Sequence, residues 1–237
     1  MTTDPHREPS TDPHADPHTD RGTDPHTDRG TDLLGRWNDL LARCGATGDP
    51  APYGEELLRR WAEPQRRYHT TAHLTAVLDA VDTLAGHADD ADTVRLAAWF
   101  HDAVYRPDRS ENEERSAALA ERALAEAGLT PARIAGTARL VRLTATHDPA
   151  PGDRDGEVLC DADLAVLGGS PEAYAAYAAA VREEYGFLPE DVFRSGRAAV
   201  LRRLLALPAL YRTATAHARY EDRARRNLAT ELELLRS

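Results

Sequence analysis

The sequence predicts an all-α fold, a helical bundle built around one core. From Leu33 onward the apolar residues recur at helical spacing: Leu33, Trp37, Leu40, Leu41 and Cys44 fall on one stripe of a helix. Several segments begin with a helix-start signal. Strand signals are nearly absent, because no sustained apolar and polar alternation is bounded by hairpin dipeptides.

Each element follows from its spacing and its end signals. Ser110 with Glu113 matches a capping box, and Thr130–Pro131 and Ser170–Pro171 each combine an N-cap residue with proline at the first helical position. Arg106–Pro107 is expected to end the helix before it. The predicted helices cover residues 33–44, 54–62, 69–85, 91–104, 110–128, 130–147, 172–185, 190–206 and 212–235, with a further helix-like run at 158–168.

Residues 1–31 are expected to be a disordered tail, and residues 32–237 a single domain. The tail repeats Thr-Asp-Pro-His and Thr-Asp-Arg-Gly and has no large apolar side chain after Met1. Such a segment cannot offset the entropy lost on ordering. Its four histidines offer weak chelation, but a solvated tail is the favoured interpretation.

The bulk composition excludes several classes of protein. The formal charge is −11 and the chain has no lysine, which argues against nucleic-acid binding. No run of about 18 apolar residues predicts a membrane span, and the start lacks a signal-peptide pattern. Cys44 and Cys160 lie far apart without a CxxC pair, which fits a reducing cytoplasm.

Three apolar windows carry residues that bind metals. His69 and His73 stand four apart, so on one helix they would share a face. His101 and Asp102 stand side by side in an apolar helix, where an unpaired Asp102 would be costly to bury. The run Val158–Gly168 contains the third group, Asp161-Ala-Asp163. Together these windows predict a metal site, although each alone also fits a hydrogen-bonded core residue or a solvated helix face.

The order H…HD…D resembles the HD superfamily of metal-dependent phosphohydrolases, and most closely its predicted bacterial phosphohydrolase family. The resemblance covers residues 33–237. The matching residues are Glu63-Pro64, Arg67-Tyr68-His69, His73, Trp99-Phe100-His101-Asp102, Asn112-Glu113-Glu114, Ser116, Asp161-Ala162-Asp163-Leu164, Tyr174, Tyr177, Arg182, Glu184, Tyr185, Gly196-Arg197, Glu221 and Ala224-Arg225-Arg226-Asn227-Leu228.

The resemblance implies a ligand set for one divalent ion: His73, His101, Asp102 and Asp163. It assigns His69 to general-acid or phosphate-binding duty, because the segment is similar to the phosphodiesterase helix in which the second histidine is the ligand. Asp161 is the alternative last ligand or a catalytic residue beside the metal. The donor types suit Mn, Fe, Co, Ni, Zn or Mg.

The expected activity is hydrolysis of a phosphate ester, a nucleotide or another small phosphorylated metabolite, by attack of metal-bound hydroxide on phosphorus. Glu114 is a candidate base, and Glu113 is assigned to the capping box. Arg67 is a candidate phosphate clamp. His147 is a candidate for substrate binding or for a second ion.

Two other classes stay open: a non-catalytic nucleotide-sensing HD protein, and a helical scaffold whose histidines are core residues. Cyclic-nucleotide or alarmone hydrolysis is an alternative within the enzyme class. The sequence leaves homo-oligomerisation, the metal's identity and the number of ions open.

Overall fold

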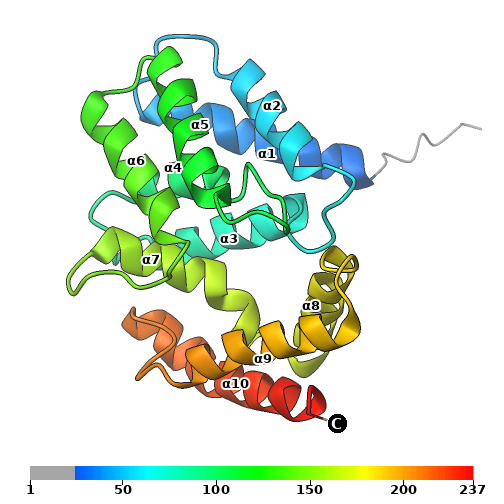
Figure 1. The fold of residues 1–237 in the computed structure, drawn as a ribbon. Coiled ribbons are helices and arrows are strands. Elements are labelled where there is room, and N and C mark those ends of the chain that lie inside the picture. Colours follow the sequence, from blue (N-terminus) through cyan, green and yellow to red (C-terminus); the bar gives the residue numbers. More distant parts are fainter. Residues whose placement is uncertain (1–24, 237) are drawn as a thin grey trace, which may run out of the picture.

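The computed structural model describes residues 25–236, with side chains from Leu33 onward, and these residues are entirely helical apart from their connections (Figure 1). The described residues contain no strand, so the predicted all-α class is confirmed. The elements are α1 (Pro25–Arg43), α2 (Ala51–Trp61), α3 (Thr71–Leu84), α4 (Ala91–Phe100), α5 (Asn112–Glu126), α6 (Pro131–Leu143), α7 (Arg154–Asp163), the 3-10 helix η1 (Leu164–Gly168), α8 (Pro171–Glu184), α9 (Glu190–Leu205) and α10 (Ala214–Leu234).

Residues 1–24 of the predicted tail lie outside the described residues. α1 begins at Pro25, inside the range 1–31 that the sequence assigns to the tail. None of the helices in the described part of the chain is both long and apolar enough to span a membrane.

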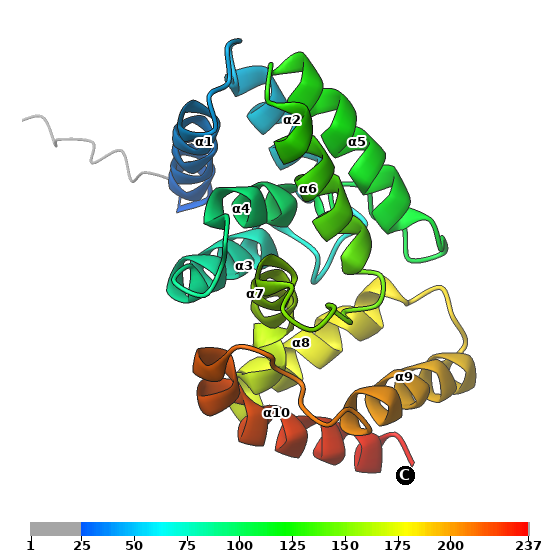
Figure 2. The same ribbon diagram turned by 90° about the vertical axis from the view of Figure 1, so that its left-hand side faces the viewer.

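The helix α4 lies inside the bundle, in contact with α1, α3, α5, α6 and α7 (Figure 2). Leu96, Trp99 and Phe100 are fully buried, as expected for a helix that is apolar on all sides. Two tryptophans of neighbouring helices fix its position. The rings of Trp37 and Trp99 meet edge to face at 5.2 Å, and Trp61 Nε1 donates to the carbonyl of Trp99 at 3.1 Å. The C-terminal end of α4 is thus held rigidly.

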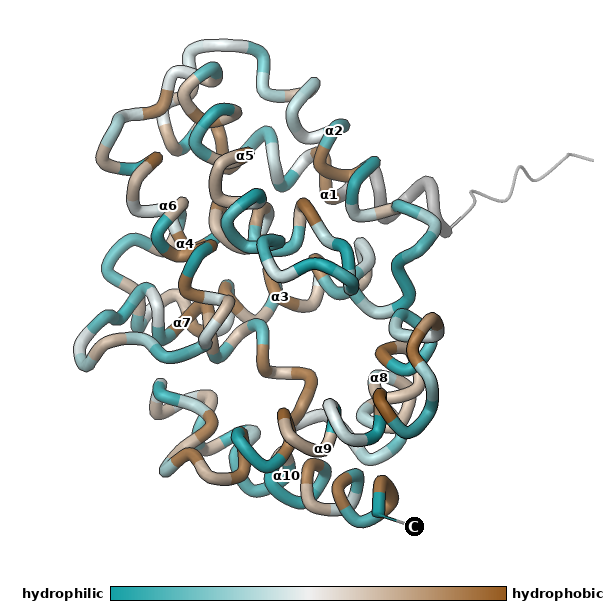
Figure 3. The backbone as a smooth tube through the Cα atoms, viewed as in Figure 1, coloured by the Kyte–Doolittle hydropathy of each residue, from teal (hydrophilic) through white to brown (hydrophobic). Residues whose placement is uncertain are grey.

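The helices α8, α9 and α10 form a second group below α3 and α7 in the view of Figure 1. The apolar segment η1 follows α7 and contacts both α8 and α10 (Figure 3). Gly168 permits this approach, because a Cβ there would lie 2.5 Å from Tyr220 Cβ. Asn227 of α10 donates to the carbonyls of Leu167 and Gly169 at 2.8 and 3.1 Å. The two groups of helices are therefore joined through η1.

Two of the three predicted helix starts are confirmed, and the third is wrong. Thr130 and Ser170 accept hydrogen bonds from the backbone N–H three residues later. The capping box of Ser110 and Glu113 does not form, because α5 begins at Asn112 and its N-cap, Glu111, makes no side-chain cap bond. Instead the Asn112 side chain bonds both backbone polar groups of Arg106 and so secures the preceding loop.

The helices around the predicted metal site also end differently from the prediction. α3 begins at Thr71 rather than at His69, and α4 ends at Phe100, so His101 is its C-cap and Asp102 lies beyond it. A buried arginine explains part of this difference. Arg66 is 4% exposed and donates to the carbonyls of His69 and Asp102, at 3.0 and 2.8 Å. It thereby satisfies carbonyls that a continuing helix would have bonded.

Candidate metal centre and its cavity

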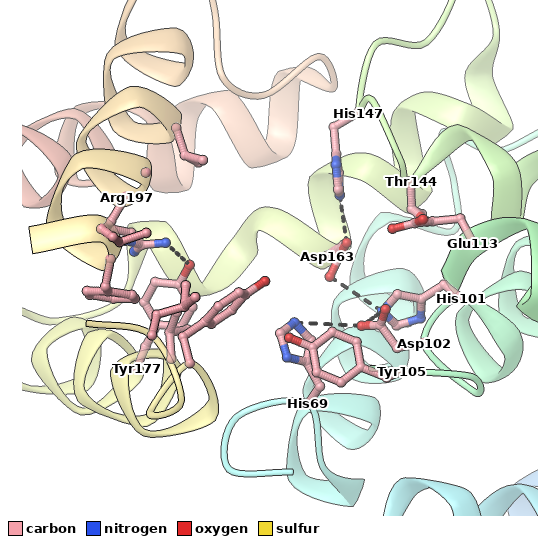
Figure 4. Close-up of a pocket in the computed structure, with 17 residues that line it drawn as sticks. His69, His101, Asp102, Tyr105, Glu113, Thr144, His147, Asp163, Tyr177 and Arg197 are labelled. Atoms are coloured by element: carbon pink, nitrogen blue, oxygen red, sulfur yellow. Dashed lines mark hydrogen bonds and ion pairs between the residues drawn. The ribbon is translucent and has the colours of Figure 1, made fainter. Parts of the chain in front are cut away.

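Four predicted ligands converge from α3, from the C-cap of α4 and the residue after it, and from α7. Figure 4 shows three of them, His101, Asp102 and Asp163. His73 lies in the first turn of α3, His101 is the C-cap of α4 and is followed by Asp102, and Asp163 is the last residue of α7. The Nε2 atoms of His73 and His101 lie 3.3 Å apart. Asp163 Oδ1 lies 3.1 Å from His73 Nε2 and 3.6 Å from His101 Nε2. Asp102 Oδ2 lies 3.2 Å from His101 Nε2 and 3.9 Å from His73 Nε2.

The separations among His73, His101 and Asp163 are close to those of ligands that share one divalent ion. Ligand atoms about 2.1 Å from a common ion are separated by roughly 3.0 to 3.4 Å. The Nε2 atoms of His73 and His101 and a carboxylate oxygen of Asp163 all lie within 4.8 Å of one another. His101 Nδ1 donates to the Ala98 carbonyl at 2.9 Å, which aims Nε2 at the cluster. Two imidazoles and two carboxylates are a donor set for Mn, Fe, Co, Ni, Zn or Mg.

The electrostatics of the cluster also favour a cation. Burial lowers the pKa of His101, but the carboxylates of Asp102 and Asp163 outweigh burial and hold that pKa well above its usual value. Burial raises the pKa values of Asp102 and Asp163, but His101 outweighs burial and holds both below their usual range. At His73 burial dominates and the pKa falls. The carboxylates therefore need a positive charge beside them, which a proton on His101 or a divalent ion provides.

His69 reaches the site from the loop before α3 and not from the helix itself. Its Nε2 lies 3.9 Å from Asp102 Oδ2, and its ring stacks on Tyr105 at 4.2 Å. Its Nδ1 lies 2.7 Å from Glu184 Oε2. Burial lowers the pKa of His69, but Asp102 and Glu184 together raise it above its usual value. The ring is therefore held as a proton donor with Nε2 toward the ligand cluster.

Glu184 organises this loop, and sequence reasoning assigned it no role. Its Oε1 accepts the backbone N–H of Arg67, Tyr68 and His69 at 2.8, 2.9 and 3.0 Å. The hydroxyl of Tyr105 donates to Oε2 at 3.1 Å. Three consecutive N–H groups bound to one carboxylate keep the segment out of a helix. The available signal was a carboxylate at the end of a stripe of Tyr174, Tyr177 and Val181, where a core residue would be expected.

His147 also lies at the site. It follows α6 in a left-handed backbone conformation with φ of 52°. Its Nε2 lies 2.7 Å from Asp163 Oδ2, the carboxylate oxygen that does not face His73. Figure 4 shows its ring pointing at Asp163 from the side opposite His69. His147 therefore orients Asp163 and lines the cavity beside it.

Three other predicted site residues do not lie in the cluster. Glu114 forms a bidentate ion pair with Arg142 at 2.7 Å on the surface, and its neighbour Glu113 lines the cavity instead. The reason is the helix start at Asn112, which turns Glu114 outward. Arg67 Nη1 donates to the carbonyls of Pro64 and Arg66, so this guanidinium faces away from the cavity.

Asp161 is the third residue outside the cluster, and it is a structural carboxylate. It is fully buried and accepts the backbone N–H of Arg212 and Thr213 at 2.8 and 2.7 Å. Burial raises the pKa of Asp161 despite these two hydrogen bonds. The choice between the two aspartates therefore falls on Asp163, which alone of the pair lies beside His73 and His101.

A cavity of about 510 Å³ opens beside the cluster. His69, His101, Asp102, His147 and Asp163 line one side, and residues of α8 and α9 line the other (Figure 4). The arginine in its wall is Arg197, which donates to Glu231 at 2.7 and 3.0 Å and to the Tyr177 hydroxyl at 3.1 Å. A volume of this size is typical of small-molecule sites.

No family model, no curated protein and no solved structure matches the chain. Membership of the HD superfamily thus stays a prediction from the residues quoted above. The site is defined by its own geometry: His73, His101 and Asp163 form a group that could bind a metal ion, Asp102 and an oriented histidine lie beside it, and a cavity adjoins it.

Proposed function

We propose that this protein is an HD-type metal-dependent phosphohydrolase of the cytoplasm, which hydrolyses a small phosphate ester. One observation carries the proposal: the side chains of His73, His101 and Asp163, distant in sequence, meet at ligand spacing beside a cavity, and Asp102 lies next to His101. The two free cysteines, Cys44 and Cys160, fit a reducing compartment.

His73, His101, Asp102 and Asp163 would hold a divalent ion, which would supply the positive charge to polarise a phosphoryl oxygen and to acidify water. The chain's own residues supply the rest. His69 donates a proton from Nε2 to the leaving oxygen of the ester, because Glu184 holds Nδ1 and so directs Nε2 toward the ligand cluster. His147, anchored on Asp163, contributes a ring edge at the cavity wall that can hold a phosphate oxygen.

The first experiment measures metal content by elemental mass spectrometry after reconstitution of the full-length chain with Mn, Fe, Co, Ni, Zn or Mg. Wild type is expected to hold about one ion more per chain than Asp102→Ala. Asp148→Ala is the matched control, since this aspartate follows His147 directly, its side chain is 75% exposed and it pairs with Arg212 on the surface. The histidines of residues 1–31 are present in all three proteins, so the difference reports the cluster.

Phosphate release from a panel of phosphate esters is then measured with the ion that binds. Turnover that is present in wild type and in Asp148→Ala, and lost in Asp102→Ala, supports the proposal. Stoichiometric metal with no release from any ester would overturn the hydrolase and leave the sensing alternative. Equal metal content in all three proteins would remove the metal centre itself.

A further inference from the structure

The cavity beside the ligand cluster has two unlike walls. The wall at the cluster is polar and includes Glu113, Thr144 and His147. The opposite wall, built by α8, α9 and their connection, carries large apolar and aromatic side chains. These residues are Val181, Tyr185, Leu188, Val192, Phe193 and Val200. A ligand that binds at the cluster and fills the cavity therefore contacts an apolar surface on the opposite side.

Part of this apolar wall is open to solvent. Among the described residues, the exposed large hydrophobic side chains are Phe187, Val192, Val200 and Leu234. Val192 is 50% exposed and Val200 is 40% exposed, and both line the cavity. Apolar surface left in water beside a polar site is typical of a ligand-binding wall. A ligand that covered it would gain affinity from the burial.

The charges of the cavity disfavour a second phosphate group. Arg197 is the only arginine among the described residues that line it, and the chain has no lysine. Both carboxylate oxygens of Glu231 already bind the Arg197 guanidinium, which is 9% exposed. Glu113 faces the same space without an ion pair in the described part of the chain. The ion and the histidines of the cluster can balance one phosphate, and the described residues that line this cavity offer no unpaired arginine for another.

We propose that the substrate is a phosphate monoester of an apolar alcohol, whose hydrocarbon part lies against the α8 and α9 wall. This inference rests on the proposed hydrolase function and narrows it. In the reaction a water oxygen bonds to phosphorus and the bond from phosphorus to the ester oxygen breaks. One proton of the water passes to the released alcohol, so the products are the alcohol and inorganic phosphate.

The test uses the full-length, metal-loaded protein and alkyl phosphates of increasing length, from ethyl to hexyl. Their leaving alcohols have nearly equal acidity, so differences in kcat/KM report contacts of the chain. Each methylene that is fully buried contributes up to about fourfold. We expect kcat/KM to rise at least about tenfold from ethyl to hexyl phosphate, and adenosine triphosphate to be a poorer substrate than hexyl phosphate.

A double variant locates the effect. The variant with both Val192→Ser and Val200→Ser changes two half-exposed side chains, so we expect the fold to be retained. This variant should lower the ratio of kcat/KM for hexyl phosphate to kcat/KM for ethyl phosphate at least about threefold. Leu234→Ser is the control, because this side chain is 65% exposed on α10 and does not line the cavity. That variant should keep the wild-type ratio.

The outcomes separate this inference from the function on which it rests. Turnover that does not vary with chain length, or that is fastest with the triphosphate, overturns the substrate class and leaves the hydrolase standing. Absence of turnover with metal bound overturns the hydrolase. In that case calorimetry with hexylphosphonate and ethylphosphonate tests whether the apolar wall binds hydrocarbon. Equal affinities for the two compounds would overturn the proposed apolar binding wall. An affinity at least about tenfold tighter for hexylphosphonate would support the wall.

Discussion

Asp161 and Asp163 stand two residues apart on α7 and meet different surroundings. Residues two apart on a helix point to nearly opposite sides. Asp161 therefore faces the segment before α10, where two backbone N–H groups bind it. Asp163 faces His73, His101 and His147. One carboxylate fixes a loop and the other completes the ligand cluster.

Exchange of these two residues for alanine should have separate effects. Asp161→Ala leaves the N–H groups of Arg212 and Thr213 without partners and should lower the free energy of unfolding by about 3 kcal/mol. Its metal content should equal that of wild type. Asp163→Ala should lose the metal. Urea unfolding and elemental analysis check both, and a metal-free but otherwise stable Asp161→Ala protein would contradict the assignment.

Glu184 is the other residue whose environment decides its role. Burial alone would raise its pKa, but His69 and the backbone N–H groups of Arg67 and His69 lower the pKa to about 2. A depressed carboxylate pKa means stabilisation that is complete above about pH 4.5 and is lost as the pH falls toward 2. This contribution amounts to about 3 kcal/mol.

Glu184→Gln should therefore be less stable than wild type at pH 7 by up to about 3 kcal/mol, and the gap should close as the pH falls from 4.5 to 2. Glu183→Gln is the matched control, since this neighbour is 66% exposed. Chemical denaturation at a series of pH values measures the difference. A gap between wild type and Glu184→Gln that did not change with pH would rule out the charge as the cause.

At the scale of elements, the positions of the helix ends determine which side chains reach the candidate metal site. α3 begins two residues after its predicted start, because Glu184 accepts the backbone N–H groups of the residues before it. α4 ends four residues before its predicted end, because Arg66 donates to the carbonyls of the residues after it. The side chains of His69 and Asp102 consequently come from irregular backbone at two helix ends. The end of α5 depends on a glycine: Gly128, with φ of 81°, follows the C-cap residue Ala127.

Gly128→Ala should lower the free energy of unfolding by about 1 to 3 kcal/mol. The φ of 81° disfavours a side chain, and the added Cβ would lie 2.3 Å from Thr47 Oγ1. Gly86→Ala is the control: it lies in a turn after α3, with ordinary φ and open space around the added Cβ. It should be neutral or slightly stabilising. Thermal unfolding of the two variants checks this, and equal losses would contradict the glycine argument.

At the scale of the whole molecule, the ligand cluster joins elements that are distant in sequence. α3, α4 with its C-cap, and α7 each position candidate ligands, while α8 contributes Glu184, which holds the His69 loop. An ion that binds only when these elements are packed must stabilise the folded state.

Metal at about one hundred times its dissociation constant should add about 2.7 kcal/mol to the free energy of unfolding. For a chain of this size the increase corresponds to a rise in Tm of about 5 to 10 °C. His101→Ala should show no rise on addition of metal. Differential scanning calorimetry with and without the ion makes the comparison, with His87→Ala as a control that should respond like wild type. A wild-type Tm that is insensitive to every divalent ion would contradict a structural coupling to the site.

The sequence by itself determined the helical class, most helix positions, and His73, His101, Asp102 and Asp163 as the candidate ligands. Those features follow from local spacing, from proline and capping signals, and from polar residues inside apolar windows. Tertiary structure alone decided which carboxylate of each close pair faces the cavity, Asp163 over Asp161 and Glu113 over Glu114. It also placed Arg197 rather than Arg67 in the cavity wall, and assigned Glu184 and Arg66 to the loops around the cluster. The physical reason is that a helix end moved by two residues redirects its side chains, and such ends are set by partners far away in the sequence.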